Sequence, residues 1–352
     1  MPSSPNTLNR RAVMKLAGKG ALGGLAMAAL PGPVTAALAA SQRLEIAGNA
    51  LLAGGKPIRL LGVAVGDPLF VRAKRSIDDF RVIANDWRAN VVRISLHPSQ
   101  WRNDREASLI GLTRDITAAR ANGLWVILDW HAIGAPDGWY DKPGEDWGLP
   151  EDVYKSSTAT ALEFWTEMAK IFGADPGVVF ELWNEPTVDP RVDESTGNFW
   201  AQLKPAWLKM IAAIRKHSEV IVLASGARFA HDLKQVKSNL IDDPRTAYAW
   251  HCYPNEDKGK AGRWHSSLDG LPKIKPVFVT EWGFCNSCGA DLEATAASFG
   301  QVFMDSVLEP YRLHSTAWCY SPGASPQMLE QDDRPTEFGA FVKHQIATAA
   351  RP

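Results

Sequence analysis

Short apolar runs that alternate with helical patterns are the feature that most limits how this chain can fold. Eight such runs cover residues 59–65, 90–95, 124–129, 178–183, 220–225, 246–250, 276–281 and 316–320. Most are continuously apolar rather than alternating, which is typical of strands covered on both faces in a parallel sheet. Eight strand–helix repeats without an interrupting linker predict one α/β domain, a single (β/α)8 barrel.

Helical periodicity lies between the apolar runs, at residues 77–87, 108–122, 157–172, 198–216 and 292–309. The segment before the first run, residues 44–60, has turn signals at Gly48-Asn49 and Gly54-Gly55. Glycine-containing turns between short apolar stretches indicate a β-hairpin. We expect this N-terminal hairpin to cap the bottom of the barrel.

The first 39 residues differ from the rest of the chain. They have a basic start, a weakly apolar middle and a small-residue end, which is typical of an export signal. The pair Arg10 and Arg11 resembles the bacterial twin-arginine signal, and Ala37-Leu38-Ala39 predicts a cleavage site. An uncleaved membrane anchor is the alternative, but the apolar run is short and glycine-rich for a spanning helix. We expect an exported mature chain of residues 40–352.

Charge excludes some partners. The signal segment holds four basic and no acidic residues, so the remaining chain has 34 basic and 39 acidic side chains, a net charge of −5. Such a surface attracts neither nucleic acid nor an anionic membrane. Gly18, Gly20 and Gly23 match the dinucleotide-binding pattern, but no strand precedes them, as that pattern requires. An uncharged partner fits this chain better.

The chain has four cysteines. Cys285 and Cys288 could close a tight loop by a disulfide, which would persist in an exported protein. Cys252 lies beside His251, but a zinc site needs a second pair or well-spaced histidines. The sequence leaves the disulfide open, and we expect neither a metal nor a cofactor.

Polar residues gather where the predicted strands end. Barrel enzymes carry their chemistry at the carboxyl ends of strands. Taken alone, each such residue has an ordinary structural explanation, but six of the eight strands carry one at the same end. The pattern therefore predicts an active site, formed by Arg93, His131, Asn184, Glu185, His251, Tyr253, Glu281 and Trp318.

These motifs, taken in order, resemble those of glycoside hydrolase family 5, the cellulase-like family in the clan of retaining β/α-barrel glycosidases. LWNEP at residues 182–186 resembles the strand-four motif, which implies that Glu185 is the acid/base. VTEWG at residues 279–283 resembles the strand-seven motif, which implies that Glu281 is the nucleophile. VVRIS, LDWH, HCYP and TAWCY supply the other recurrent positions, which implies supporting roles for Arg93, His131, Asn184, His251 and Tyr253 and substrate binding by Trp318.

Glycosidic cleavage explains why two carboxylates are needed. A retaining enzyme holds two carboxyl groups about 5–5.5 Å apart, so that one attacks the sugar and the other donates a proton. The tips of the fourth and seventh strands can face each other across a barrel mouth. We expect Arg93 and Tyr253 to keep Glu281 ionised, and Asn184 to bond the sugar 2-hydroxyl.

Tryptophan is abundant, with 14 Trp against 6 Tyr. An indole stacks on the C–H face of a sugar, and besides Trp318 we expect Trp139, Trp147 and Trp282 to contact substrate. The sequence predicts a monomeric retaining enzyme that cleaves a neutral β-linked polysaccharide, an endo-β-1,4-glucanase. A β-mannanase or another β-glucanase of the same family is the alternative, and a sugar-binding barrel without catalysis is less favoured because both carboxylates are present.

Overall fold

The computed structural model describes residues 42–70, 75–136, 157–187, 198–254, 261–289 and 292–349. Within these residues, no helix is both long and apolar enough to cross a membrane. The predicted signal segment and its cleavage site lie outside them.

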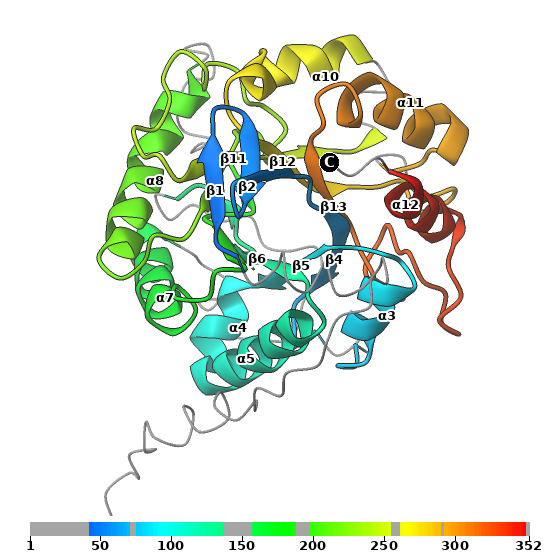
Figure 1. Ribbon diagram of the computed structural model, residues 1–352, viewed down its shortest axis with the longest axis horizontal. Coiled ribbons are helices and arrows are strands. Elements are labelled where there is room, and N and C mark those ends of the chain that lie inside the picture. Colours follow the sequence, from blue (N-terminus) through cyan, green and yellow to red (C-terminus); the bar gives the residue numbers. More distant parts are fainter. Residues whose placement is uncertain are drawn as a thin grey trace, which may run out of the picture. The chain divides into compact units, whose positions relative to one another are not determined.

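Eight parallel strands close into a barrel, as predicted (Figure 1). The strands are β4 (Leu61–Gly66), β5 (Val91–Leu96), β6 (Trp125–Trp130), β8 (Val178–Glu181), β10 (Val222–Ser225), β11 (Thr246–Cys252), β12 (Val277–Trp282) and β13 (His314–Ala317). Each lies within or beside one of the predicted apolar runs. The ring closes where β13 pairs with β4, with Ser315 opposite Leu61. The (β/α)8 prediction is confirmed.

Helices surround the barrel strands (Figure 1). They are α3 (Asp79–Asn85), α4 (Pro98–Asn103), α5 (Arg105–Ala121), α7 (Thr158–Ile171), α8 (Phe199–Arg215), α10 (Ala261–Leu268), α11 (Gln301–Phe303) and α12 (Glu337–Thr348). A π-helical turn precedes α11 and another follows it, η4 (Ala296–Gly300) and η5 (Met304–Leu308), and a 3-10 turn, η3 (Leu271–Lys273), precedes β12. The five predicted helical segments are present, whereas α4, α10 and α12 were not predicted.

Side-chain caps define where several helices begin. Asp104 accepts a hydrogen bond from the Ala107 amide at the start of α5, and Asn198 accepts one from the Ala201 amide at the start of α8. Each cap satisfies a backbone donor that the first helical turn leaves unpaired. These side-chain caps therefore fix the N-terminal ends of α5 and α8.

The N-terminal segment is a three-stranded antiparallel sheet rather than the predicted hairpin. Its strands are β1 (Leu44–Ala47), β2 (Ala50–Ala53) and β3 (Lys56–Ile58). Both predicted turns are present, and the second one leads into the short third strand. Two turns in succession make three strands, so the hairpin prediction was incomplete.

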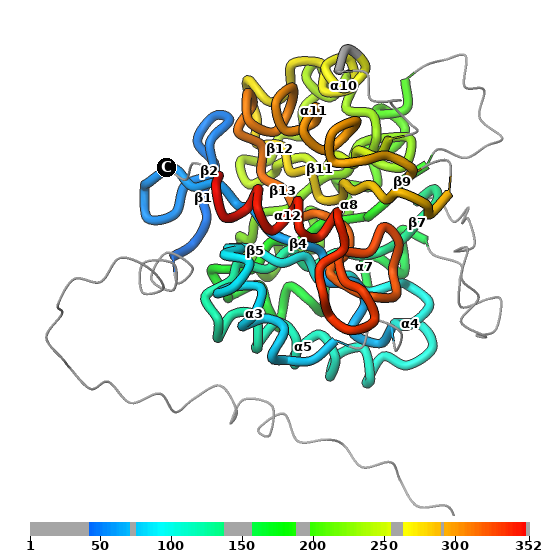
Figure 2. The backbone as a smooth tube through the Cα atoms, turned by 90° about the vertical axis from the view of Figure 1, so that its right-hand side faces the viewer, coloured from blue at the N-terminus to red at the C-terminus, as the bar shows by residue number. Residues whose placement is uncertain are grey.

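This small sheet closes the bottom of the barrel. Leu44 and Leu51 belong to one apolar cluster with interior residues at the amino ends of the barrel strands, among them Val91, Trp125 and Phe278. The Arg245 side chain also donates a hydrogen bond to the Leu44 carbonyl. Figure 2 shows β1 and β2 at one end of the barrel and the short strands β7 (Ile133–Gly134) and β9 (Glu185–Pro186) at the other. The capping prediction is confirmed.

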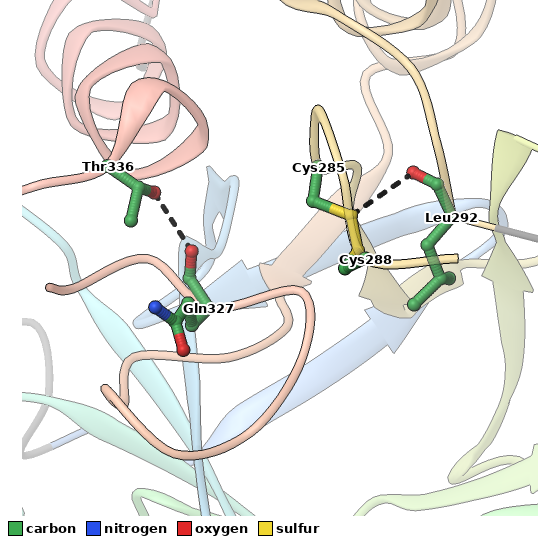
Figure 3. The surroundings of a disulfide bond; sticks show 5 residues. All are labelled: Cys285, Cys288, Leu292, Gln327 and Thr336. Carbon is green, nitrogen blue, oxygen red and sulfur yellow. Dashed lines mark hydrogen bonds between the residues drawn. A yellow bond between two sulfur atoms is a disulfide. The ribbon is translucent and has the colours of Figure 1, made fainter. Parts of the chain in front are cut away.

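A disulfide joins Cys285 to Cys288 in the loop that follows β12 (Figure 3). The loop is also held by backbone hydrogen bonds, from the Cys285 amide to the Leu292 carbonyl and from the Ala294 amide to the Cys285 carbonyl. Cys252 and Cys319 are buried thiols. The disulfide that the sequence left open is present, and it lies on the same side of the barrel as the carboxyl ends of the strands.

Leu51 and Leu52 test the packing of the capping sheet. Leu51 is 1% exposed and Leu52 is half-buried, on the opposite face of the same strand. We expect Leu51→Ala to lower the free energy of unfolding by about 2–5 kcal/mol, because it leaves a cavity under the barrel. Leu52→Ala, the matched control, should cost clearly less. Urea denaturation measures both, and equal losses would contradict the packing described.

Candidate active site

Arg93, on β5, is the centre of a buried polar cluster at the carboxyl ends of the strands. Its Nη1 donates to Glu281 Oε1 at 2.7 Å, and its Nε donates to Glu181 Oε2 at 2.6 Å. Its Nη2 donates to Asn184 Oδ1 at 2.7 Å and lies 3.0 Å from Asp129 Oδ2. The guanidinium is fully buried. A buried cation requires such partners, so Arg93 fixes the ends of four strands at once.

Glu281, at the carboxyl end of β12, is held as a carboxylate. Besides Arg93, the Tyr253 hydroxyl donates to its Oε2 at 2.8 Å. Burial alone would raise the pKa of Glu281, but the charges of His251 and Arg93 outweigh burial and lower it to about 2. Burial and the negative charge of Glu281 raise the pKa of Tyr253 well above its usual value. Tyr253 therefore stays a hydrogen-bond donor.

Glu185 lies in the same site as Glu281 but on a different structural element. It opens β9, which pairs with β7, and the Glu185 amide donates to the Ala132 carbonyl at 3.0 Å. Its side chain is 18% exposed, whereas that of Glu281 is 6% exposed. One oxygen of Glu185, one of Glu281 and one nitrogen of His251 all lie within 4.8 Å of one another. The two acidic groups thus face each other across a short gap.

His251 stands between the two carboxylates. Its Nδ1 lies 3.3 Å from Glu185 Oε1 and 3.7 Å from Glu281 Oε2, and its Nε2 lies 3.1 Å from Thr280 Oγ1. Burial alone would lower the pKa of His251, but the charge of Glu281 and hydrogen bonds to acidic side chains raise it to about 9. His251 is therefore an imidazolium at neutral pH, with both ring nitrogens as donors.

Trp318 follows β13 and forms one wall of the site. Its indole stacks on the His131 imidazole, with centroids 5.1 Å apart and planes inclined by 7°. The Arg93 guanidinium lies 6.0 Å from the Trp318 ring centre. His131 is itself oriented by Asp129, whose Oδ2 lies 2.7 Å from Nδ1. Trp318 is partly exposed, so this arrangement leaves a fixed aromatic surface beside His131 and Arg93.

The structure brings together Glu185, Glu281, Arg93, His131, Asn184, His251, Tyr253 and Trp318 as described above. The prediction that Trp282 contacts substrate is wrong. It is 2% exposed and packs against Phe303 and Phe338, because it points outward from β12 toward the helices, and it cannot contact substrate there. Trp139 and Trp147 lie outside the described residues.

Glu181, Asp129 and Thr280 are site residues that the sequence analysis missed. Thr280 Oγ1 donates to Glu181 Oε1 at 2.8 Å, which links Glu181 to His251. Burial would raise the pKa of Glu181, but Arg93 beside it lowers it. The sequence signal that could have identified Asp129 and Glu181 is that each is a carboxylate within an apolar run. An acid that is buried in a strand needs a partner.

Glu185, His251 and Glu281 are also spaced so that they could hold a metal ion. Both oxygens of Glu281 already accept hydrogen bonds, one from Arg93 and one from Tyr253. A divalent cation there would have to displace these donors and lie beside two further positive charges, on Arg93 and His251. The donor set suits proton transfer better than metal binding.

The fold and the site together define the class of protein. It is a (β/α)8 barrel in which two carboxylates face each other, one at the end of the fourth barrel strand and one at the end of the seventh. The sequence matches the family described as Cellulase (glycosyl hydrolase family 5) over residues 51–324. The chain belongs to this family, as its motifs predicted.

Curated relatives carry endoglucanase names. Endoglucanase N of Pectobacterium atrosepticum is 25% identical over 240 residues, which are 67% of this chain and 48% of the relative. Endoglucanase A of Evansella cellulosilytica is 25% identical over 317 residues, 84% of this chain and 58% of the relative. The chain thus spans about half the length of the curated relatives that it matches.

Solved structures share the fold. The β-glucanase SdGluc5_26A from Saccharophagus degradans, in complex with cellotetraose, has a TM-score of 0.75 and 25% identity, covering 87% of this chain and 93% of that one. The catalytic domain of endoglucanase Cel5A (E5) from Thermobifida fusca has a TM-score of 0.70 and 19% identity, covering 89% and 99%. At that identity the second likeness concerns the fold alone.

The titration of His251 tests the electrostatics of the site. His251 should stay cationic up to about pH 9 and become neutral above it. Glu281→Gln removes the neighbouring negative charge, so we expect the pKa of His251 to fall by about 1 or more. Histidine-selective NMR titration measures it. Glu219→Gln, at an acid that is 67% exposed and paired with Arg245, is the control. An unchanged His251 titration in Glu281→Gln would contradict the coupling.

Proposed function

We propose that the protein is a retaining glycoside hydrolase that cleaves β-linked glucan by double displacement, with Glu281 as nucleophile and Glu185 as acid/base. The observation that carries the proposal is the short gap between the two carboxylates, whose nearest oxygens lie within 4.8 Å. Retaining enzymes need about 5–5.5 Å between the groups, whereas inverting ones need room for a water, about 6.5–9.5 Å.

The first step uses the asymmetry of the two acids. A Glu281 oxygen bonds to the anomeric carbon of the sugar, the bond from that carbon to the leaving oxygen breaks, and Glu185 gives its proton to that oxygen. Arg93 and Tyr253 fix the attacking carboxylate, since each donates to one of its oxygens. Positioned charges that need no reorganisation during reaction lower the barrier.

The second step returns the enzyme to its starting state. Glu185, now a carboxylate, takes a proton from water, whose oxygen bonds to the anomeric carbon while the bond to Glu281 breaks. The His251 Nδ1 at 3.3 Å from Glu185 steadies this carboxylate in the glycosyl-enzyme. Asn184 keeps its amide nitrogen for a sugar hydroxyl, because its oxygen accepts from Arg93.

A neutral β-1,4-linked glucan is the substrate that we propose. Trp318 offers a partly exposed indole near Arg93, which binds Glu281, and stacking on an aromatic face suits the C–H surface of a pyranose. The endoglucanase names of the relatives and the cellotetraose bound to the structural neighbour support glucan over mannan.

Activity and product stereochemistry test this function. Purified protein should release reducing ends from β-1,4-glucan, and NMR soon after mixing should show the β-anomer first. Glu281→Gln and Glu185→Gln should each lower kcat by at least about 1000-fold on a natural leaving group. Glu219→Gln should stay within about twofold. An α-anomer as first product would rule out double displacement, and full activity in Glu281→Gln would remove its assigned role.

We also propose that residues 1–39 direct export by the twin-arginine route. The Cys285–Cys288 disulfide supports an exported protein, because disulfides persist in oxidising compartments. Replacing Arg10 and Arg11 together by Lys keeps the charge and should leave the precursor inside the cell, whereas replacing Lys15 and Lys19 by Arg should not. Fractionation and immunoblotting of a bacterial host decide this, and normal export of the first variant would refute the route.

A further inference from the structure

Thr280 lies directly before Glu281 on β12 and is fully buried. It is an extra residue in the register between β11 and β12. Trp250 of β11 lies opposite Val279, and the next residue, His251, lies opposite Glu281, so Thr280 falls between two pairs. Such an extra residue is a β-bulge, a feature that re-aims side chains and is common next to active sites.

The bulge lets two consecutive side chains reach the same ring. In a regular strand, successive side chains point to opposite faces. Here Thr280 Oγ1 lies 3.1 Å from Nε2 of His251, and Glu281 Oε2 lies 3.7 Å from Nδ1. The Thr280 carbonyl accepts a hydrogen bond from the Thr316 hydroxyl on β13 at 2.8 Å. The neighbouring strand therefore holds the bulge in place, and Thr280 contacts the ring nitrogen that does not face Glu185.

The charge of Glu181 determines the direction of the hydrogen bonds around Thr280. Burial alone would raise the pKa of Glu181, but Arg93, whose Nε donates to Oε2 at 2.6 Å, lowers it. Glu181 is therefore a carboxylate and only accepts hydrogen bonds. The Thr280 hydroxyl donates its proton to Glu181 Oε1 at 2.8 Å. With that proton engaged, the Thr280 oxygen accepts from Nε2–H of His251.

Carboxylates face both nitrogens of the His251 ring. Glu181 Oε1 lies 3.9 Å from Nε2, whereas Glu185 Oε1 and Glu281 Oε2 lie 3.3 Å and 3.7 Å from Nδ1. The other titratable or charged groups nearby act on these carboxylates or on the His251 backbone, and they are Arg93, His131, Tyr253 and His231. Because both nitrogens are attracted, charge alone does not fix the rotation of the ring. The Thr280 oxygen is closer to Nε2 than Glu181 is, so the rotation depends on it.

We propose that Thr280 is a positioning residue, which holds His251 so that Nδ1–H points at Glu185. The inference rests on the proposed function and deepens it. As Glu185 gives its proton to the leaving oxygen, negative charge develops on its carboxylate, and Nδ1–H at 3.3 Å is a donor for that charge. A donor that is already oriented needs no reorganisation when the charge appears. Thr280 thus acts on the proton transfer through His251.

Two substrates test this role. A β-1,4-glucan oligosaccharide needs the proton of Glu185, whereas a dinitrophenyl β-cellobioside has a leaving group that departs as an anion. Thr280→Val removes the hydroxyl and keeps the branched shape. We expect its kcat/KM to fall about 30-fold on the oligosaccharide and about threefold or less on the aryl substrate, because only the first requires charge to develop on Glu185. Thr280→Ser keeps the hydroxyl and should recover most of the loss.

Thr246→Val is the matched control. Thr246 is also buried on a barrel strand, at the amino end of β11, and its hydroxyl donates to Asp243 Oδ1 at 3.0 Å. The variant loses the same kind of hydrogen bond far from the active site, so kcat/KM on both substrates should stay within about twofold. Equal losses on the two substrates in Thr280→Val would reduce Thr280 to a structural role, and an unchanged value on the oligosaccharide would overturn the inference.

The protonation of the His251 ring tests the positioning without turnover. Nitrogen NMR of histidine-labelled protein, with His251→Asn to assign the signals, shows which ring nitrogen loses its proton above about pH 9. In the native protein we expect Nδ1 to lose it and Nε2 to keep it. Glu185 has an 18% exposed side chain and can turn to water, whereas Thr280 is buried between Glu181 and His251. In Thr280→Val this preference should disappear.

The two measurements separate this inference from the proposed function. Loss of the proton from Nε2 in the native protein would overturn the inference, whatever the activity and whether or not the variants fold. The expected NMR pattern in a protein that cleaves neither substrate would sustain the positioning of His251 by Thr280 and refute the function. Cleavage of both substrates with equal losses in Thr280→Val would sustain the function and refute the positioning.

Discussion

The buried guanidinium of Arg93 is the interaction on which the site depends. A charge taken out of water is costly unless opposite charges and hydrogen-bond acceptors surround it. Asp129, Glu181 and Glu281 supply the charges, each from a different barrel strand. The strands must therefore end at matching heights, or the cation loses a partner. The proposed nucleophile is in this sense also a structural ion, which explains why its carboxylate is so firmly held.

The two proposed catalytic glutamates have different environments because they lie on different structural elements. Glu281 lies on a barrel strand and bonds to Arg93, whereas Glu185 lies beyond β8, on the short β7–β9 pair, with no bond to that cation. Its side chain is also the more exposed of the two. The different roles proposed for these two glutamates, nucleophile and acid/base, thus follow from where the backbone places each side chain. The His251 ring lies close to both carboxylates and links them electrostatically.

The sequence predicted what local pattern determines, and missed what depends on distant contacts. The barrel strands were readable because buried parallel strands are continuously apolar. The third strand of the N-terminal sheet, residues 56–58, was not, since it is short and contains Pro57. Trp282 was misplaced because an aromatic beside a strand-end acid can face either the mouth or the helices. Glu181 and Asp129 look like interruptions of apolar runs until Arg93 is seen between them.

The pairing of β13 with β4 determines when the barrel can close during biosynthesis. Because the last barrel strand pairs with the first, the sheet keeps two open edges until the ribosome has released nearly the whole chain. Open edges invite pairing with other molecules, so the nascent protein needs protection for most of its synthesis. The Arg93 cluster is completed only when β12 has been synthesised, so the proposed active site cannot form until translation is almost over.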